Sequence, residues 1–290
     1  MTGVPDLADM IAVIDSEART RDDIFTGPSQ PTPHGRSFGG QVLGQALSAA
    51  GVTTPEGREL HSMHGYFLRP GKTGQRMTFE VARLYDGRSF STRRVQAYQG
   101  GEVLMSLIAS FQNVDEGVQH QEPFDMGTVP GPEELPSVWE RYGHLADSGR
   151  ASWVLNRPFD IRHIGSDVLL QVDDDRSALQ QVWLRSRDTL EGDQLAHSAA
   201  LAFASDYLLL EPTMRRHGVP WATPGLRSAS LDHAMWFHRP FRVDDWLLYT
   251  LESPTAQGGR GLAYGRFHNR SGELVATVAQ EAMFRVPEDL

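Results

Sequence analysis

The chain contains the same short pattern twice, and this internal repeat constrains its fold more than any other feature. His64-Gly65-Tyr66-Phe67-Leu68-Arg69-Pro70 corresponds to Ala234-Met235-Trp236-Phe237-His238-Arg239-Pro240, with aromatic residues before an Arg-Pro pair in both. Downstream, Gly101-Glu102-Val103-Leu104 matches Gly272-Glu273-Leu274-Val275. The offsets are 170 residues (Arg69 to Arg239) and 171 residues (Gly101 to Gly272). A nearly constant offset indicates a duplicated structural unit.

Each half shows a small-residue helix followed by strands. Residues Gly39 to Gly51, and about Asp193 to Ser205, are rich in Ala or Gly and contain no proline, so we expect helices that can lie close to a sheet. Alternating apolar residues predict the strands that follow, with glycine-rich turns between them. These strands are expected at Met77 to Val81, Val103 to Phe111, Trp246 to Glu252, Leu262 to His268 and Leu274 to Phe284. An Arg-Pro pair is expected at the start of the first long strand.

A helix followed by antiparallel strands occurs twice, which predicts the α+β class. In this class we expect a long sheet that wraps a central helix. We expect a first repeat in residues 1–115, a connection in 116–155 and a second repeat in 156–290. The Pro-rich stretch Pro123 to Pro136 is the natural linker, and Pro5 to Ala18 is expected to add a short helix.

Composition excludes several classes of function. The formal charge is −10, from 27 basic and 37 acidic residues, which argues against general nucleic-acid binding. The chain has no cysteine, which excludes disulfides, thiolate catalysis and thiolate metal sites. Its apolar runs are far shorter than the ~20 residues that span a bilayer, and its acidic N-terminal stretch is unlike a secretory signal. These features predict a cytoplasmic protein without stable membrane insertion.

At these motifs the chain resembles the acyl-CoA thioesterase II family. The similar segments are Phe38-Gly39-Gly40-Gln41-Val42-Leu43-Gly44-Gln45-Ala46, His61 to Gly71, Ala204-Ser205-Asp206, Leu231 to Pro240, and Val278-Ala279-Gln280-Glu281. The resemblance extends from about Ile24 to Arg285. It implies a double hot-dog fold, hydrolysis of acyl-CoA without a cofactor or metal, and catalytic residues at Asp206, Ser230 and Gln280. Ser230 stands where bacterial members of the family more often carry threonine.

These three residue types suit thioester hydrolysis, which needs an attacking water, a proton acceptor and stabilisation of the oxyanion. Asp206 can accept the proton, and desolvation at the end of a helix would raise its pKa. Ser230 and Gln280 can orient the water. Gln280 is the most unusual, because it interrupts an apolar alternating strand and must find partners if it is buried.

The candidates for substrate binding are indicated less specifically by their residue types. Gly39 and Gly40 begin a helix whose free N–H groups could bind the oxyanion, although they could equally serve only helix packing. His61, Arg69 and Arg239 are candidates for substrate contact. A structural role for His61, and a sheet-edge salt bridge for either arginine, remain open alternatives.

Three other patterns have a simpler explanation. Gly35-Arg36-Ser37-Phe38-Gly39 fits a nucleophile motif but follows a Pro-rich loop, so Ser37 is expected to cap the next helix. Asp173-Asp174-Asp175 is interpreted as a solvated turn. Asn269-Arg270-Ser271 matches a glycosylation sequon by letters only.

Two other functions remain as alternatives. An enoyl-CoA hydratase or dehydratase of the hot-dog type would use an Asp and a His, and Asp232-His233 is the nearest hint. Adjacent strand residues point to opposite faces, however, so His233 is expected to be structural or to line a pocket. A non-catalytic acyl-CoA binding module is the second alternative. The first repeat has Leu60 and Ala109 near the positions of Ser230 and Gln280, so it is expected to be a degenerate copy. Open sheet edges predict a homodimer or tetramer.

Overall fold

The computed structural model describes residues 6–16, 22–32, 35–148 and 151–287. Within them, 13 strands form one antiparallel sheet in the order β1-β2-β4-β5-β6-β3-β10-β13-β12-β11-β8-β7, with β9 paired to β13. The strands are β1 Ile14–Asp15, β2 Asp23–Gly27, β3 Arg58–Phe67, β4 Met77–Asp86, β5 Phe90–Gln99, β6 Glu102–Asn113, β7 Phe159–Ile164, β8 Leu179–Ser186, β9 Arg227–Ser230, β10 Asp232–Phe237, β11 Leu247–Gln257, β12 Arg260–Asn269 and β13 Leu274–Arg285. The predicted α+β class and double hot-dog fold are therefore confirmed.

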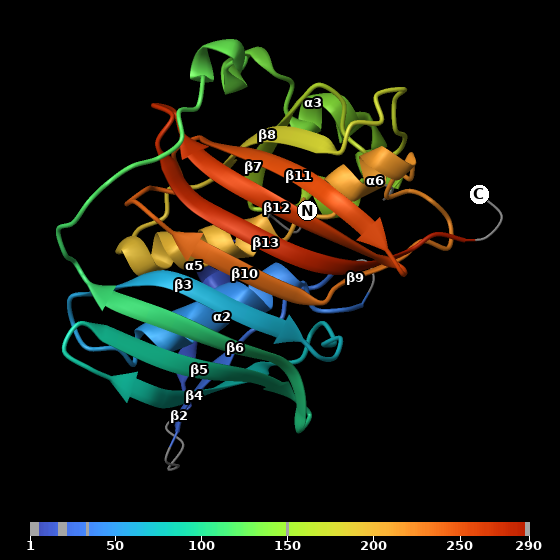
Figure 1. Cartoon of the computed structure of the whole chain (residues 1–290). Helices are drawn as coiled ribbons and strands as arrows, with labels where there is room; N and C mark the ends of the chain where they lie inside the picture. The colour runs from blue at the N-terminus through green and yellow to red at the C-terminus, as the bar shows by residue number, and fades with distance from the viewer. Residues whose placement is uncertain (1–5, 17–21, 33–34, 149–150, 288–290) are drawn as a thin grey trace.

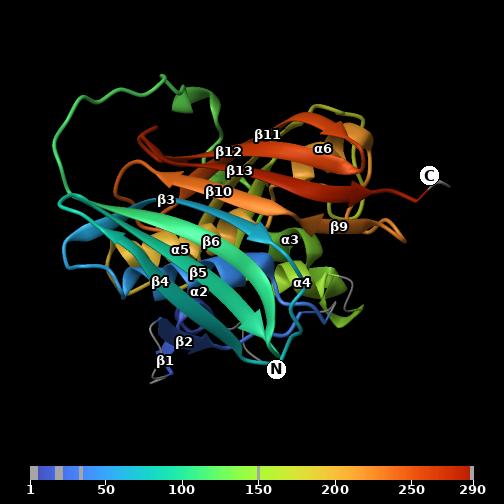
Figure 2. The same ribbon diagram turned by 60° about the horizontal axis from the view of Figure 1, so that its bottom comes forward.

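The sheet curves around two central helices, α2 (Gly39–Gly51) and α5 (Gln194–Ser205) (Figures 1 and 2). They run antiparallel and touch through their small residues. A Cβ on Gly40 would lie 2.2 Å from the carbonyl oxygen of Phe203, and one on Gly44 would lie 3.0 Å from that of Ala199. The Ala and Gly content of both segments therefore lets two backbones share the inside of one sheet.

The two repeats join where β3 pairs with β10, so that the sheet continues from one repeat into the other. Met63 of β3 and Met235 of β10 are opposite each other and fully buried. They belong to one apolar core that also contains Leu43 and Leu47 of α2 and Leu201 of α5. Because burial of such side chains is worth roughly 1.5–3 kcal/mol each, this shared core binds the repeats into one body.

The predicted helices and strands are present, with three differences. The second helix begins one residue later than expected, because Asp193 is its N-cap and accepts a hydrogen bond from Ala196 N at 3.1 Å. The expected N-terminal helix is short, α1 (Leu7–Ile11), and Pro5, Glu17 and Ala18 lie outside the described residues. The placement of Arg-Pro at a strand start was wrong: Arg69 and Arg239 follow the ends of β3 and β10.

The connection between the repeats contains short helical turns and covers part of the outer sheet face. Phe124 and Met126 pack there against Trp183 and Trp246, and Trp183 Nε1 donates to the Pro130 carbonyl at 2.9 Å. The remaining helices are η1 Met126–Thr128, η2 Pro132–Glu134, α3 Val138–Tyr142, η3 Gly143–Ser148, α4 Ser152–Leu155 and α6 Glu211–His217. Among the helices in the described part of the chain, none is long and apolar enough to cross a bilayer.

Candidate active site

Asp206 lies where the end of one central helix meets the beginning of the other. It is the C-cap residue of α5, and α2 begins beside it at Gly39. A Cβ on Gly39 would lie only 2.8 Å from Asp206 Oδ2. The antiparallel arrangement of α2 and α5 thus places a carboxylate against a helix N-terminus, where the partial positive charge of the backbone dipoles favours an anion.

The three predicted catalytic residues converge, although they come from three elements. Ser230 ends β9, and its Oγ donates to Asp206 Oδ1 at 2.9 Å. Gln280 lies on the inward face of β13, and its Nε2 donates to Ser230 Oγ at 3.1 Å. Pairing of β9 with β13 brings Ser230 beside Ala282, two residues beyond Gln280. The carboxylate, hydroxyl and amide therefore form one connected polar group.

Burial sets the acidity of this group. It raises the pKa of the Asp206 carboxyl to about 6, while hydrogen bonds from Ser230, the Gly40 backbone and Gln280 each act to lower it. A carboxyl with this pKa is ionised at neutral pH and is a stronger base than an exposed aspartate, whose pKa is ~4. Asp206 therefore matches the requirements of a general base that operates near pH 7.

The polar group continues inward through two residues that sequence reasoning did not place in the site. His233 of β10 is buried, and its Nδ1 lies 2.6 Å from Gln280 Oε1. Its Nε2 lies 3.0 Å from the hydroxyl of Ser205, which also reaches the Ala202 carbonyl at 2.9 Å. Burial lowers the pKa of His233 to about 4, so the ring is neutral near pH 7. From the sequence, strand alternation indicated only that His233 faces away from Asp232 and is structural or lines a pocket.

Asp232 and His233 do not form a dyad. The Asp232 carboxylate accepts the backbone N–H of Glu281 at 2.7 Å, whereas the His233 ring points inward to Gln280 and Ser205. Opposite faces of β10 carry the two side chains, as the strand alternation predicts. The residue pair that would serve a hydratase is thus separated by the sheet itself.

Gly39 and Gly40 lie at this site, and the reason is visible in their contacts. The Gly40 N–H is directed to the Asp206 carboxylate. Close packing is also served, since a side chain on Gly40 would collide with Phe203. The helix-packing interpretation therefore holds for Gly40, whereas binding of an oxyanion by Gly39 and Gly40 stays a prediction.

The aromatic residues around the helix ends fix their relative position. Tyr207, which follows Asp206, stacks on Phe38 with ring centroids 4.4 Å apart. The buried Arg157 guanidinium lies 4.3 Å from the centroid of the same tyrosine ring. These contacts hold the end of α5 against the beginning of α2, and so hold Asp206 against Gly40.

His61, Arg69 and Arg239 lie away from this group. His61 bonds to Ser110 Oγ at 2.8 Å and meets the edge of Phe90 on the outer face of the sheet. Arg69 bonds to the Val103 carbonyl at 3.1 Å and forms an ion pair with Glu102 at 2.9 Å. Arg239 donates to the Leu274 carbonyl at 2.8 Å. Each arginine joins its own strand end to the neighbouring strand, Arg69 through the sheet-edge salt bridge and Arg239 through a hydrogen bond to a backbone carbonyl.

The other sequence patterns have ordinary structural roles. Ser37 was expected to cap α2, but the N-cap is Phe38; the Ser37 hydroxyl instead bonds to Ser29 at 2.8 Å and to the Lys72 carbonyl at 3.2 Å. Asp173 pairs with Arg215 at 3.2 Å. Asn269 closes a turn by accepting from Ser271 N at 3.1 Å.

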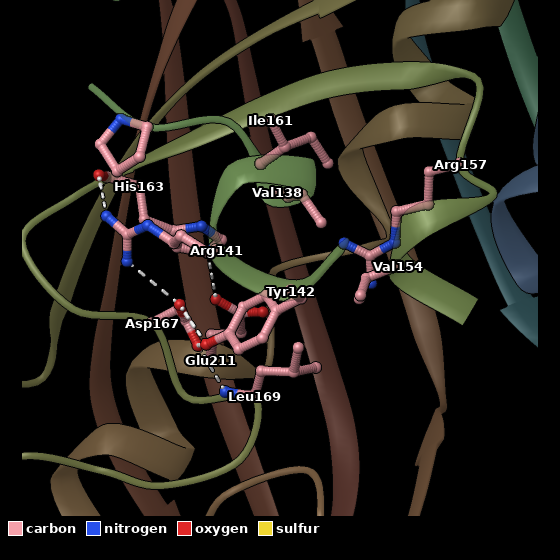
Figure 3. Close-up of a pocket in the computed structure, with 11 residues that line it drawn as sticks. Val138, Arg141, Tyr142, Val154, Arg157, Ile161, His163, Asp167, Leu169 and Glu211 are labelled. Carbon is pink, nitrogen blue, oxygen red and sulfur yellow. Dashed lines mark hydrogen bonds and ion pairs between the residues drawn. The ribbon is translucent and has the colours of Figure 1, made fainter. Parts of the chain in front are cut away.

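A small cavity between the connection and the second repeat gathers further buried polar groups (Figure 3). Asp167 accepts from Tyr142 at 2.7 Å and from Arg141 at 3.2 Å, and His163 lies 3.2 Å from Glu211. The cavity measures about 10 Å³, which is room for one water. Among the described residues, its lining does not include the Asp206 group. We therefore assign it to the internal packing of α3, α4 and α6.

The first repeat carries apolar residues where the second carries polar ones. Leu60 and Ala109, the counterparts of Ser230 and Gln280, are buried in the core. Met63 is the counterpart of His233, and Val52 caps α2 where Asp206 caps α5. The polar set therefore occurs only once in the described part of the chain, and the first repeat has the degenerate character expected from its sequence.

The fold and this group define a hot-dog enzyme with a carboxylate at the meeting point of two central helices, and comparison with known proteins gives the family. Residues 166–283 match the acyl-CoA thioesterase family, and residues 28–112 match the acyl-CoA thioesterase N-terminal domain. The chain belongs to the acyl-CoA thioesterase family.

Similar proteins span nearly the whole chain. Human acyl-coenzyme A thioesterase 8 is 38% identical over 280 residues, covering 91% of this chain and 85% of the human protein. Acyl-CoA thioesterase 2 of Haemophilus influenzae is 34% identical, with 92% and 94% covered. The crystal structure of an acyl-CoA thioesterase II from Mycobacterium marinum superposes with a TM-score of 0.77 at 38% identity, covering 98% of both chains.

Proposed function

We propose that this chain hydrolyses acyl-CoA thioesters to a carboxylic acid and CoA with a water molecule activated by Asp206. The observation that carries the proposal is the hydrogen-bonded group of Asp206, Ser230 and Gln280 at the N-terminus of α2. Family membership supports the substrate class. Residues 156–290 would supply the reacting side chains, and residues 1–115 would supply the helix N-terminus.

The reaction follows from this arrangement. Asp206 removes a proton from water, whose oxygen bonds to the thioester carbon while Ser230 and Gln280 hold it. The carbonyl oxygen gains negative charge beside the N-terminus of α2, whose backbone dipoles would stabilise that charge. Collapse of this intermediate breaks the carbon–sulfur bond, and the proton held by Asp206 passes to the leaving thiolate. The chain then requires neither a covalent enzyme intermediate nor a metal.

The test compares two aspartates that are close in sequence but lie in different surroundings. With palmitoyl-CoA, Asp206→Asn should lower kcat for thiol release by about 10²–10⁴-fold. The matched control is Asp232→Asn, which keeps an acceptor for Glu281 N and should retain activity within about threefold. Hydration of crotonyl-CoA without thiol release would instead favour the hydratase. Binding of palmitoyl-CoA by wild-type protein without turnover would favour the binding module.

A further inference from the structure

We propose that His233 is a positioning residue, which fixes the orientation of the Gln280 amide and thereby the donors that face Asp206. This inference rests on the proposed function. Gln280 has an oxygen and an amino group of nearly equal size, and only one orientation presents N–H groups to Ser230 and the carboxylate. A buried neighbour of Gln280 must therefore fix the orientation of its amide.

A chain of hydrogen bonds that starts at the Asp206 carboxylate determines the orientation of the Gln280 amide. An ionised Asp206 needs donors, so Ser230 donates to it and Gln280 presents its amino group toward Ser230. The Gln280 oxygen then faces His233 Nδ1 at 2.6 Å, and this nitrogen must carry the proton. A neutral ring with its proton on Nδ1 leaves Nε2 as an acceptor. The Ser205 hydroxyl, 3.0 Å away, then donates its single proton to Nε2 rather than to the Ala202 carbonyl.

The opposite proton arrangement would disturb the site. If His233 carried its proton on Nε2, it would donate to Ser205, whose hydroxyl would turn to the Ala202 carbonyl. A bare Nδ1 would then repel the Gln280 oxygen at 2.6 Å, and the amide would rotate. Its oxygen would face Ser230 and draw the Ser230 proton away from Asp206. The tautomer of one buried ring is thereby coupled to the state of the catalytic carboxyl.

The first repeat shows that the fold does not need this polar pair. Register places His233 opposite Gln280, one position beyond the pair Ala234–Ala279. In the first repeat the corresponding pair is Met63 opposite Ala109, and both are fully buried. Burial of a histidine and an amide costs desolvation that Met and Ala avoid. The polar pair is therefore explained by chemistry at the site rather than by packing of the strands.

A double-mutant cycle tests the proposal with palmitoyl-CoA as substrate. His233→Leu should lower kcat about 10- to 100-fold with KM changed less than threefold, and should move the acidic limb of the pH profile upward from about pH 6. His233→Asn, whose amino group can replace the Nδ1 donor, should remain within about fivefold of wild type. In a Gln280→Ala background, His233→Leu should cause no further loss, because its effect passes through the amide. Exposed His64, on the outer face of β3, supplies the control His64→Asn, which should match wild type.

The outcomes separate the two proposals. Equal loss from His233→Leu in both backgrounds, or equal activity of the Leu and Asn variants, overturns the positioning role. Full kcat in Gln280→Ala and Asp206→Asn overturns the proposed function itself. Melting temperatures identify variants that fail to fold. In that case Ser205→Ala replaces His233→Leu in the cycle, with an expected loss of about three- to tenfold that must vanish in the Gln280→Ala background.

Discussion

His64 and Ala234 face each other across the junction of β3 and β10, and they are also equivalent residues of the two repeats. A residue that pairs with its own counterpart marks a local two-fold axis. Around this axis the meeting of α5 with α2 at Asp206 has a counterpart where α2 ends at Val52 near the beginning of α5. Only the first of these meeting points carries the polar set in the described residues, so the symmetry of the fold is broken at the level of chemistry.

The pH dependence of activity should reveal the environment of Asp206. Its pKa is raised to about 6 by burial, so kcat/KM should fall as the pH drops below about 6, rather than below the ~4 of an ordinary aspartate. Ser230→Ala removes a hydrogen bond that lowers this pKa, so the limb should move to higher pH. Initial rates of thiol release from pH 4.5 to 8.5 measure both. A wild-type limb near pH 4 would contradict the assigned environment.

Ionisation of Asp206 should also destabilise the folded protein. The folded pKa lies above the unfolded one, so the native state binds more protons between pH 4 and 6, and the free energy of unfolding falls as pH rises through this window. Above pH 6 the penalty is complete. Asp206→Asn should therefore raise the melting temperature at pH 8 by roughly 3–8 °C, with little gain at pH 4. Equal gains at both pH values would contradict the linkage.

The close approach of α2 and α5 should not tolerate a methyl group at its tightest point. Gly40→Ala places a carbon 2.2 Å from a backbone oxygen, so we expect a loss of about 2–3 kcal/mol in the free energy of unfolding, together with reduced activity. Gly44→Ala is the matched substitution, because its nearest contact is 3.0 Å and alanine favours a helix by about 1 kcal/mol. Urea denaturation should show the Gly40 variant to be clearly the less stable of the two.

Converting the second site to the residues of the first should separate stability from activity. The triple variant Ser230→Leu, His233→Met and Gln280→Ala copies a set that is buried in the first repeat at Leu60, Met63 and Ala109. It should fold and lose thiol release by at least about 10²-fold. Its stability should be close to that of wild type at pH 4, where Asp206 is protonated, and lower than wild type at pH 8, where the buried carboxylate lacks its Ser230 and Gln280 donors. Circular dichroism melting and the thiol assay decide the matter. A triple variant that unfolds would mean that the polar set also supports the fold.

The repeat, the helix–strand order and the strand positions were predictable because they depend on local periodicity and on self-comparison. Gln280 was predictable because a polar residue in an apolar strand needs partners. For His233, the sequence predicted only the face of the strand on which it lies. Its contacts with Ser205 and Gln280 could not be predicted, because they depend on the register of β10 with β13 and on the position of α5. The Arg-Pro pairs were misplaced because the local pattern that favours a strand end resembles one that favours a strand start.

The continuous sheet formed by β3 and β10 has a consequence for how such an enzyme can diversify. In an assembly of identical subunits, each new side chain appears at every copy of a site, and each copy bears its cost. Here the two repeats are separate parts of one chain. The first repeat can therefore accept apolar substitutions that stabilise the core, while the second keeps polar side chains whose burial costs desolvation. The first repeat can thus lose buried polar side chains at Leu60, Met63 and Ala109 while the N-terminus of its helix α2 still contributes to the site.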